Sequence, residues 1–206
     1  MINRYGVKGI QEIIAQPPYG RVLGSHFGGS IVACDYVANC QNGTGATTGT
    51  FAANTLYALP LVAPARGGVI SVIGCEVTTA SAGNSVEVLL YANQTDQSDI
   101  YPGALLAFTG NMSATSTGIK TVGITQALTP GAIYWLGLTT NASIVCRGLA
   151  VGGVAHFLGM DSTATNLVNM GITVAETHGA HTANFPAGGT WITAIPIPIL
   201  RYRFSA

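Results

Sequence analysis

Glu176, His178 and His181 form an E-x-H-x-x-H pattern, the densest grouping of side chains in this sequence that could do chemistry. Carboxylate and imidazole groups are ligands that zinc accepts. Catalytic zinc motifs of this type place two histidines four residues apart on a helix. Here the spacing is three and Gly179 lies between the histidines. The pattern favours a polar surface loop without a metal. The alternative is a metal site in which three copies of one histidine meet on a trimer axis.

Hydrolytic chemistry has little support in the remaining residues. A covalent hydrolase needs a nucleophile, a base and a group that orients the base, and the G-x-S-x-G motif is missing. Asp96 and Asp99 are the one close acidic pair, and their surroundings are typical of a turn. We therefore expect no enzymatic activity and no cofactor.

The basic residues are too few and too scattered to predict nucleic-acid binding. Eight Lys and Arg balance eight Asp and Glu, so the formal net charge is zero, whereas nucleic-acid binding needs a basic face. Arg201 and Arg203 are the one tight basic pair, and we expect them to meet acidic groups on a partner protein. No stretch has the uninterrupted apolar length of a membrane-spanning helix, so we expect no membrane partner.

The scarcity of charge predicts association. Only 8% of residues are charged, where about 25% is usual. A neutral Ser, Thr, Asn and Gln exterior could cover such a chain, and so could burial between subunits, because obligate interfaces resemble a divided core. We expect both, and we predict a homo-oligomer.

Short strands are predicted for the central part of the chain. Apolar runs at 56–64, 69–77, 85–91, 118–125 and 128–140 are bounded by Gly, Pro, Asn, Ser and Thr, which is typical of strands joined by turns. We predict an all-β fold, an antiparallel β-sandwich. In the run 86–91 both faces are apolar, apart from Glu87, which predicts a strand that is covered on both sides. The second cover would be a neighbouring subunit or the chain's own arms.

The flanking segments differ from this block. Residues 1–30 predict an N-terminal arm that docks on a neighbouring subunit or on another protein through residues such as Arg4, Tyr5, Lys8, Tyr19 and Arg21. Its run VKGIQEIIAQ predicts a short helix or an extended stretch, and Pro17-Pro18 ends that run. The alternative is a strand and loop wrapped on its own domain, residues 31–206. A short helix is predicted near 161–170, and the Pro-rich end IPIPILRYRF predicts an edge strand or an extended tail. Cys75 and Cys146 are expected in the core, and Cys34 and Cys40 as free thiols.

An ordered set of motifs resembles a β-sandwich domain of tailed-bacteriophage virion proteins. The motifs are LYALPLVAP, CEVTTASAG, VEVLLY followed by a polar turn and YPGALLAF, and LTPGAIYWLGL. They recur in tail fibres, receptor-binding proteins and head fibres, and here they cover residues 56–140. The resemblance implies a jelly-roll-like sandwich and a structural role in a virion. It does not distinguish head from tail.

Taken together, these observations predict a trimeric capsid decoration protein or a fibre or spike component. It would be made in the cytoplasm of the bacterial host and attached to other virion proteins by its arm. The alternative is an adhesin that binds host-surface glycan, with Tyr91, Tyr101 and Trp191 as stacking residues. The competing interpretation of these aromatic residues is core packing.

Overall fold

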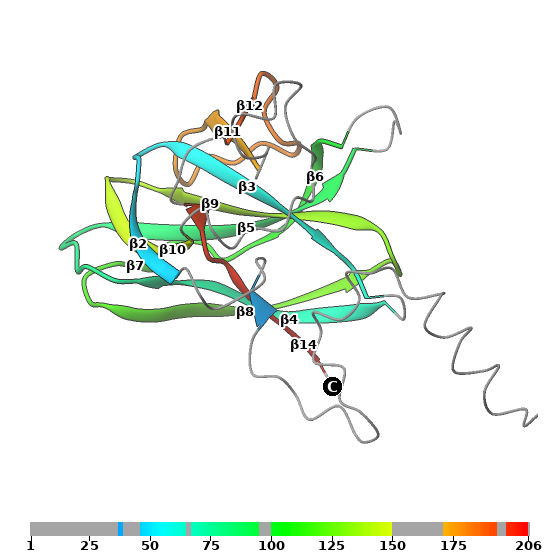
Figure 1. The fold of residues 1–206 in the computed structure, drawn as a ribbon, viewed down its shortest axis with the longest axis horizontal. Coiled ribbons are helices and arrows are strands. Elements are labelled where there is room, and N and C mark those ends of the chain that lie inside the picture. The colour runs from blue at the N-terminus through cyan, green and yellow to red at the C-terminus, as the bar shows by residue number, and fades with distance from the viewer. Residues whose placement is uncertain are drawn as a thin grey trace, which may run out of the picture.

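Two antiparallel β-sheets stacked as a sandwich form the fold (Figure 1). The computed structural model describes residues 37–38, 46–64, 67–94, 100–149, 171–192 and 197–205. Every regular element in these ranges is a strand, so the predicted all-β antiparallel sandwich is confirmed. The predicted arm with Arg4, Tyr5, Lys8, Tyr19 and Arg21, the predicted helix at 161–170, and Cys34 and Cys40 lie outside the described residues. Within these ranges, no helical segment has the length and hydropathy needed to span a bilayer.

The first sheet includes β4 and β8, which run along the bottom of the sandwich in Figure 1. Its central strand is β4, which is flanked by β8 on one side and by β14 and β10 on the other. Its seven strands are β1 (Val37–Ala38), β2 (Ala46–Phe51), β4 (Gly68–Val77), β8 (Gly118–Leu128), β10 (Ile144–Leu149), β13 (Ile197–Pro198) and β14 (Arg201–Phe204).

The second sheet runs across the upper half of Figure 1 in the order β12-β11-β3-β9-β5-β6, with β7 also paired to β5. Its central pairs are regular, for example Leu89 opposite Gly137 and Leu59 opposite Leu136. Its seven strands are β3 (Thr55–Val62), β5 (Ser85–Asn93), β6 (Pro102–Phe108), β7 (Met112–Ser113), β9 (Ile133–Thr140), β11 (Ile172–Ala175) and β12 (Thr190–Trp191). The apolar runs of the sequence correspond to β3, β4, β5, β8 and β9, as predicted.

The main core fills the space between the two sheets. Alternate residues of a strand point to opposite faces, and Val86, Val88 and Leu90 of β5 point inward. Cys75 and Cys146 also lie in this core as buried free thiols, which confirms the prediction for them. Each buried Val or Leu side chain contributes about 1.5–3 kcal/mol relative to an exposed one, so this layer supplies most of the driving force for stacking the sheets.

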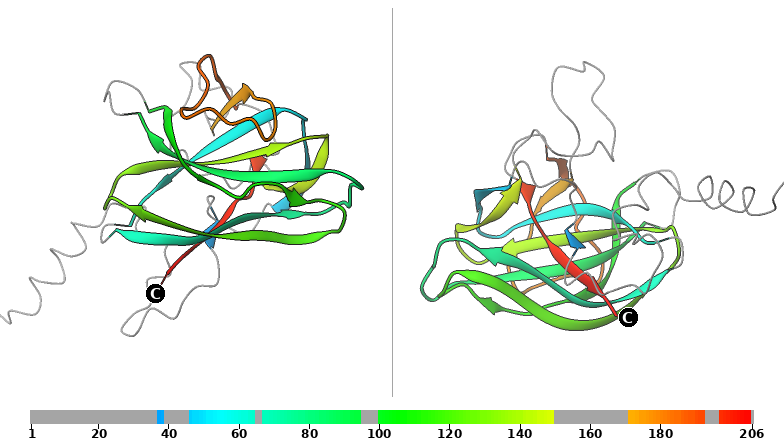
Figure 2. Two further views of the ribbon diagram at one scale, coloured as in Figure 1. Left: turned by 180° about the vertical axis from the view of Figure 1, so that it is seen from behind. Right: turned by 60° about the horizontal axis from the view of Figure 1, so that its bottom comes forward.

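A second, smaller core lies on the outer face of the second sheet. The outward residues of β5 and β9, Leu89, Tyr91 and Trp135, are fully buried there. They are covered by the chain's own segment 171–192, which contributes Ile172 and Phe185 and crosses the top of the molecule (Figures 1 and 2). The sequence predicted a second cover from either a neighbouring subunit or the chain itself, and in the structure the chain itself covers this face. A neighbouring subunit is not required to keep this face dry.

Backbone hydrogen bonds join the same segment to β6, the last strand of the second sheet. The amide of Leu105 donates to Ala183 O (2.9 Å), and the amide of Phe185 donates to Gly103 O (2.8 Å). On the other side, β11 pairs with β3 over four residues. Segment 171–192 therefore bridges the second sheet from β3 to β6 and occupies edge groups that would otherwise be open to another chain.

The C-terminal end divides into two parts. Strand β13 lies at one end of the strand order of the first sheet, as expected for a strand whose Pro198 has no amide hydrogen to donate. The following strand, β14, lies between β1 and β4, so the prediction of an edge strand or a tail is wrong for RYRF. The difference arises because Tyr202 pairs with Ile73 and points into the main core, where it is 4% exposed.

Gly137 in β9 gives a direct test of the second core. A Cβ atom at this position would meet Leu56 Cδ1 at 2.9 Å and Tyr91 Cε2 at 3.5 Å. We expect Gly137→Ala to lower the free energy of unfolding by about 1–3 kcal/mol through overpacking. Chemical denaturation measures the change. Gly123→Ala in β8 is the matched control, because the nearest atom to its Cβ would be Ser71 O at 3.8 Å. Equal effects of the two substitutions would contradict the packing described for Gly137.

Candidate functional site

The E-x-H-x-x-H residues lie in a tight turn after β11, over the second sheet. The amide of Glu176 donates to Asn54 O (3.0 Å), and that of Ala180 donates to Thr177 O (3.1 Å). Gly179 has φ 76°, in the region that the third residue of a type II turn requires. The turn directs both histidines toward the sheet.

The turn lies at the surface, where Thr177, Gly179 and Ala180 are exposed. The prediction of a polar surface loop is nevertheless wrong for the three side chains of the motif, because they are buried. The side chains of Glu176, His178 and His181 are 4%, 6% and 4% exposed. Spacing along the sequence could not reveal this, because the burial comes from the outer face of β5. That face carries Glu87, whose side chain is 3% exposed.

His181 lies between two carboxylates that come from different parts of the chain. Its Nε2 is 2.6 Å from Glu87 Oε2, and its Nδ1 is 3.2 Å from Glu176 Oε1. Glu87 Oε2 also accepts the Gly179 amide at 3.2 Å. Both ring nitrogens of a charged imidazolium are donors, so the arrangement fits a protonated His181. The ring of Phe108 packs edge-on against it, with centroids 5.5 Å apart.

His178 lies beside this group and makes contacts of a different kind. Its Nε2 is 2.7 Å from Asn111 Oδ1 and 3.0 Å from Ser85 Oγ. Its Nδ1 is 3.8 Å from Glu87 Oε2, too far for a hydrogen bond. The His178 amide donates to Asn54 Oδ1 (3.0 Å). This histidine therefore joins the turn to β5 and to the Asn111 loop through neutral contacts.

Four buried polar atoms around the same turn have no protein hydrogen-bond partner within the part of the chain that the structure describes: Tyr91 Oη, Thr139 Oγ1, Glu176 Oε2 and His178 Nδ1. Thr139 pairs directly with Glu87 across β9 and β5. The Tyr91 ring lies over Gly137, toward Glu87. Buried polar groups without partners are destabilising, and they concentrate where a site has a role beyond packing.

The surroundings shift the pKa values of these groups in opposite directions. The pKa of His181 is raised, mainly by its hydrogen bond to Glu176. Burial alone would lower this pKa, and the contact with Glu87 raises it further. Burial is the main cause that lowers the pKa of His178. Burial and then the charges of Glu176 and Glu87 raise the pKa of Tyr91. The surroundings therefore favour the charged form of His181 and the neutral form of His178.

Metal binding does not fit this arrangement. Within the described ranges, no group of three or more His, Cys, Asp or Glu side chains is arranged to hold a metal ion. Both nitrogens of His181 already contact carboxylates, and His178 Nε2 contacts Asn111 and Ser85. Since a ligand nitrogen must offer its lone pair to the metal, these contacts would have to break first.

Ser85, His178 and Glu87 have the order of a nucleophile, a base and a carboxylate, but their contacts are those of a structural network. Ser85 Oγ donates to Asn111 Oδ1 at 3.0 Å, and the Ser85 amide donates to Asn141 Oδ1 at 2.9 Å. That amide is therefore not free to stabilise an oxyanion, as acyl transfer requires. The Glu87 carboxylate bonds His181 rather than orienting His178.

The proposed glycan-stacking residues do not form one surface. Tyr91 is fully buried, and its ring meets Phe185 edge-on at 5.3 Å, so core packing is correct for it. The Tyr101 hydroxyl donates to Pro186 O (2.9 Å) and accepts from the Gly189 amide (3.0 Å). Trp191 is 44% exposed. Of the three, only Trp191 offers a substantially exposed ring.

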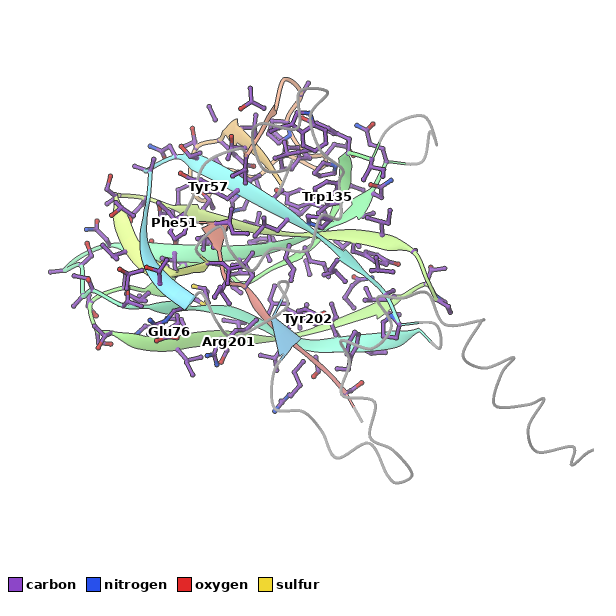
Figure 3. All side chains as sticks on the ribbon, viewed as in Figure 1. Phe51, Tyr57, Glu76, Trp135, Arg201 and Tyr202 are labelled. Carbon is purple, nitrogen blue, oxygen red and sulfur yellow. The ribbon has the colours of Figure 1, made fainter. Side chains whose placement is uncertain are left out.

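The C-terminal arginines lie on the outer face of the first sheet, where Arg201 pairs with Gly74 and Arg203 with Val72. Glu76 bonds Arg147 at 2.7 Å and lies 3.7 Å from Arg201 (Figure 3). At least one acidic group that Arg201 meets is therefore in its own chain. Arg203 also has an interaction partner.

No protein-family model matches the chain, and a search of curated proteins finds no significant match. The resemblance to virion proteins therefore rests on the motifs of the sequence.

Glu87 was not among the predicted site residues. Its position in the sequence could have indicated its role, because it is the one charged residue in the strand VEVLLY and it shares a face with Leu89 and Tyr91. A carboxylate on a face covered on both sides needs a partner. The positions of the two histidines relative to Glu87 depend on tertiary structure.

Glu87→Gln tests the buried cluster. The substitution leaves the His181 imidazolium and Glu176 without the second carboxylate, and we expect a loss of about 3 kcal/mol in the free energy of unfolding at pH 7. Glu76→Gln is the matched control. It breaks a partly exposed ion pair with Arg147 and should cost under about 1 kcal/mol. Urea denaturation of the two variants measures both values, and a Glu87→Gln effect no larger than that of Glu76→Gln would refute the assignment.

Proposed function

We propose that this protein is a structural component of a tailed-phage virion, a capsid decoration protein or a part of a fibre or spike. It would act as a homotrimer that packs against copies of itself and against other virion proteins. The observation that carries the proposal is the uncharged, exposed outer face of strand β8 in the first sheet. The motif set that resembles virion β-sandwich domains gives additional support.

The outward residues of β8 are all uncharged and exposed. They alternate with partly buried residues along the strand, and Ile119 is the most apolar of them, at 52% exposure. Thr48 and Thr50 of β2 are also uncharged and exposed, but β4 and β10, with Glu76 and Arg147, separate them from β8. The outward residues of β8 are Ile119, Thr121, Gly123, Thr125 and Ala127. A surface of Thr, Gly, Ala and Ile loses little hydration free energy when another protein covers it.

Burial of the two acidic residues of the cluster reduces the exterior charge further. Outside that cluster, the charged residues in the described ranges are Glu76, Lys120, Arg147, Arg201 and Arg203. Three of these five form the Glu76 group on the first sheet. Long-range repulsion between copies would be weak for such a surface, which favours association.

The mechanism of this function is passive. Copies would meet through the outer face of the first sheet, and β8 offers an unpaired edge, because among the described residues it pairs with β4 alone. Residues 1–30, with Arg4, Lys8 and Arg21, would attach the trimer to another virion protein.

The oligomeric state tests this proposal. We expect light scattering coupled to size exclusion to give three times the chain mass for the purified protein. Thr125→Lys adds a charge on the uncharged outer face of β8, six residues along the strand from Ile119, which pairs with Glu76. It should shift the distribution to monomer without loss of the β-sheet circular dichroism signal. Ala187→Lys is the matched control, since it adds the same charge to an exposed position of segment 171–192 on the opposite side of the sandwich. A monodisperse monomer for the unmodified protein would contradict the proposal.

A second candidate function is glycan binding at the host surface, and Trp191 is the observation that favours it. The indole is 44% exposed, and the neighbouring Thr173 and Thr190 hydroxyl groups lie 3.2 Å apart. An exposed ring beside polar groups is the arrangement that stacks on a sugar.

Trp191→Ala should abolish binding to a glycan microarray if Trp191 is the stacking residue. Phe108→Ala is the control, because Phe108 is an aromatic residue of similar exposure, 51%, on another strand. Absence of array binding by the unmodified protein, or equal binding by the two variants, would exclude this function for Trp191.

A further inference from the structure

We propose that Glu87, His181 and Glu176 form a pH-sensitive latch that fastens segment 171–192 to the outer face of the second sheet. The latch lies within one chain, so it is independent of the proposed assembly. It joins β5, which carries Glu87, to the turn at 176–181, which carries the other two residues.

The alkaline side of the latch depends on the two donors of His181. As an imidazolium it donates to Glu87 at 2.6 Å and to Glu176 at 3.2 Å. A neutral imidazole has one donor, so its other nitrogen turns a lone pair toward a carboxylate. Both carboxylates are then buried without a counter-charge, which is strongly unfavourable. Loss of this proton therefore favours release of the turn.

The acid side depends on His178. Its ring is 6% exposed, and its Nδ1 lies 3.8 Å from Glu87 Oε2. Its Nε2 contacts uncharged groups, Asn111 and Ser85. A proton on His178 would place a second buried positive charge beside His181.

These are the titratable groups that face His181 in the described part of the chain. From β5 they are Glu87 and Tyr91, and from the turn they are Glu176 and His178. β6 contributes the uncharged ring of Phe108, and β9 contributes the hydroxyl of Thr139 beside Glu87. Tyr91 stays protonated through the relevant range, because its pKa is raised.

The directions of the two histidine pKa values define the range of pH in which the latch is closed. The pKa of His181 is raised, so its stabilisation is complete below the ordinary histidine value and is lost as the pH rises through the raised value. The pKa of His178 is lowered, so folding favours its neutral form, and stability falls as the pH drops below the ordinary value toward the lowered one. The latch is therefore tightest at pH values between the lowered pKa of His178 and the raised pKa of His181. Because the two histidines interact, each apparent pKa belongs to the coupled pair.

The segment is held by two hydrogen bonds to β6 and by its buried Ile172 and Phe185, but opening would be local because its strand pairings are short. β11 pairs with β3 over four residues and with β12 over two, whereas the β4–β8 pair of the first sheet runs the length of β4. Short elements with few backbone bonds open at lower free energy than the rest of a domain. Release would expose the outer face of the second sheet, including Leu56, Ala58 and Leu89.

Hydrogen exchange of the full-length protein tests the latch. Protection factors are measured from pH 5 to pH 9 and corrected for the intrinsic exchange rate at each pH. We expect protection of residues 171–192 to be greatest near neutral pH and to fall toward each end, whereas a protein without the latch would show a constant value. Protection of β4 and β8 serves as the internal reference and should stay constant.

Two variants separate the loss of protection at high pH from the loss at low pH. His181→Gln should lower protection of 171–192 at pH 7 and remove its further decrease at alkaline pH. His178→Gln should remove the decrease at acid pH. Glu76→Gln should leave the profile unchanged, because the hydrogen bond with Arg147 lowers the pKa of Glu76 out of this range. A flat profile in the unmodified protein, or a parallel loss of protection in β4 and β8, would overturn the proposal. So would recovery of protection at pH 9 on addition of zinc, which would identify a metal site.

Discussion

The burial of one carboxylate, Glu87, is the constraint on which the upper half of the molecule depends. An ionised carboxylate on an apolar sheet face is too costly to bury without a charged or hydrogen-bonding partner. The turn at 176–181 supplies that partner as His181 and adds the amide of Gly179. Segment 171–192 thus satisfies the charge of Glu87 while it covers Leu89, Tyr91 and Trp135 around it. The ion pairs specify where the segment lies, and the apolar contacts supply most of the free energy that holds it there.

This construction changes what the low charge of the chain implies. A β-sandwich built from strands that are apolar on both faces has two outer faces to protect. The chain protects one of them with its own residues, so apolar strands alone are no argument for a partner on that side. The association argument then applies to the first sheet, whose outer face is neutral along β8 and carries a locally paired Glu76 group. Figure 3 shows the two regions at opposite ends of the sandwich, with Trp135 above and Glu76 and Arg201 below.

The assembly proposal and the latch therefore use separate surfaces. Assembly would use the first sheet, whereas the latch lies under segment 171–192, which also carries Trp191 of the glycan alternative. If the latch opens, a substantial apolar face becomes available on the side opposite the assembly surface. A protein could in this way combine permanent packing through one sheet with a conditional surface on the other, since the two faces share only the core between them.

The sequence by itself determined the fold class, because the apolar runs were short and bounded by turn residues. It also determined that β5 would be covered on both sides, and it placed Cys75 and Cys146 in the core. Only tertiary structure decided which segment forms the second cover, that Arg201 and Arg203 belong to an interior strand, and that the E-x-H-x-x-H turn is buried. The physical reason is the same in each case. Local patterns fix which face of a strand is apolar, but the partner of a buried charge comes from residues far away in the chain, and 94 positions separate Glu87 from His181.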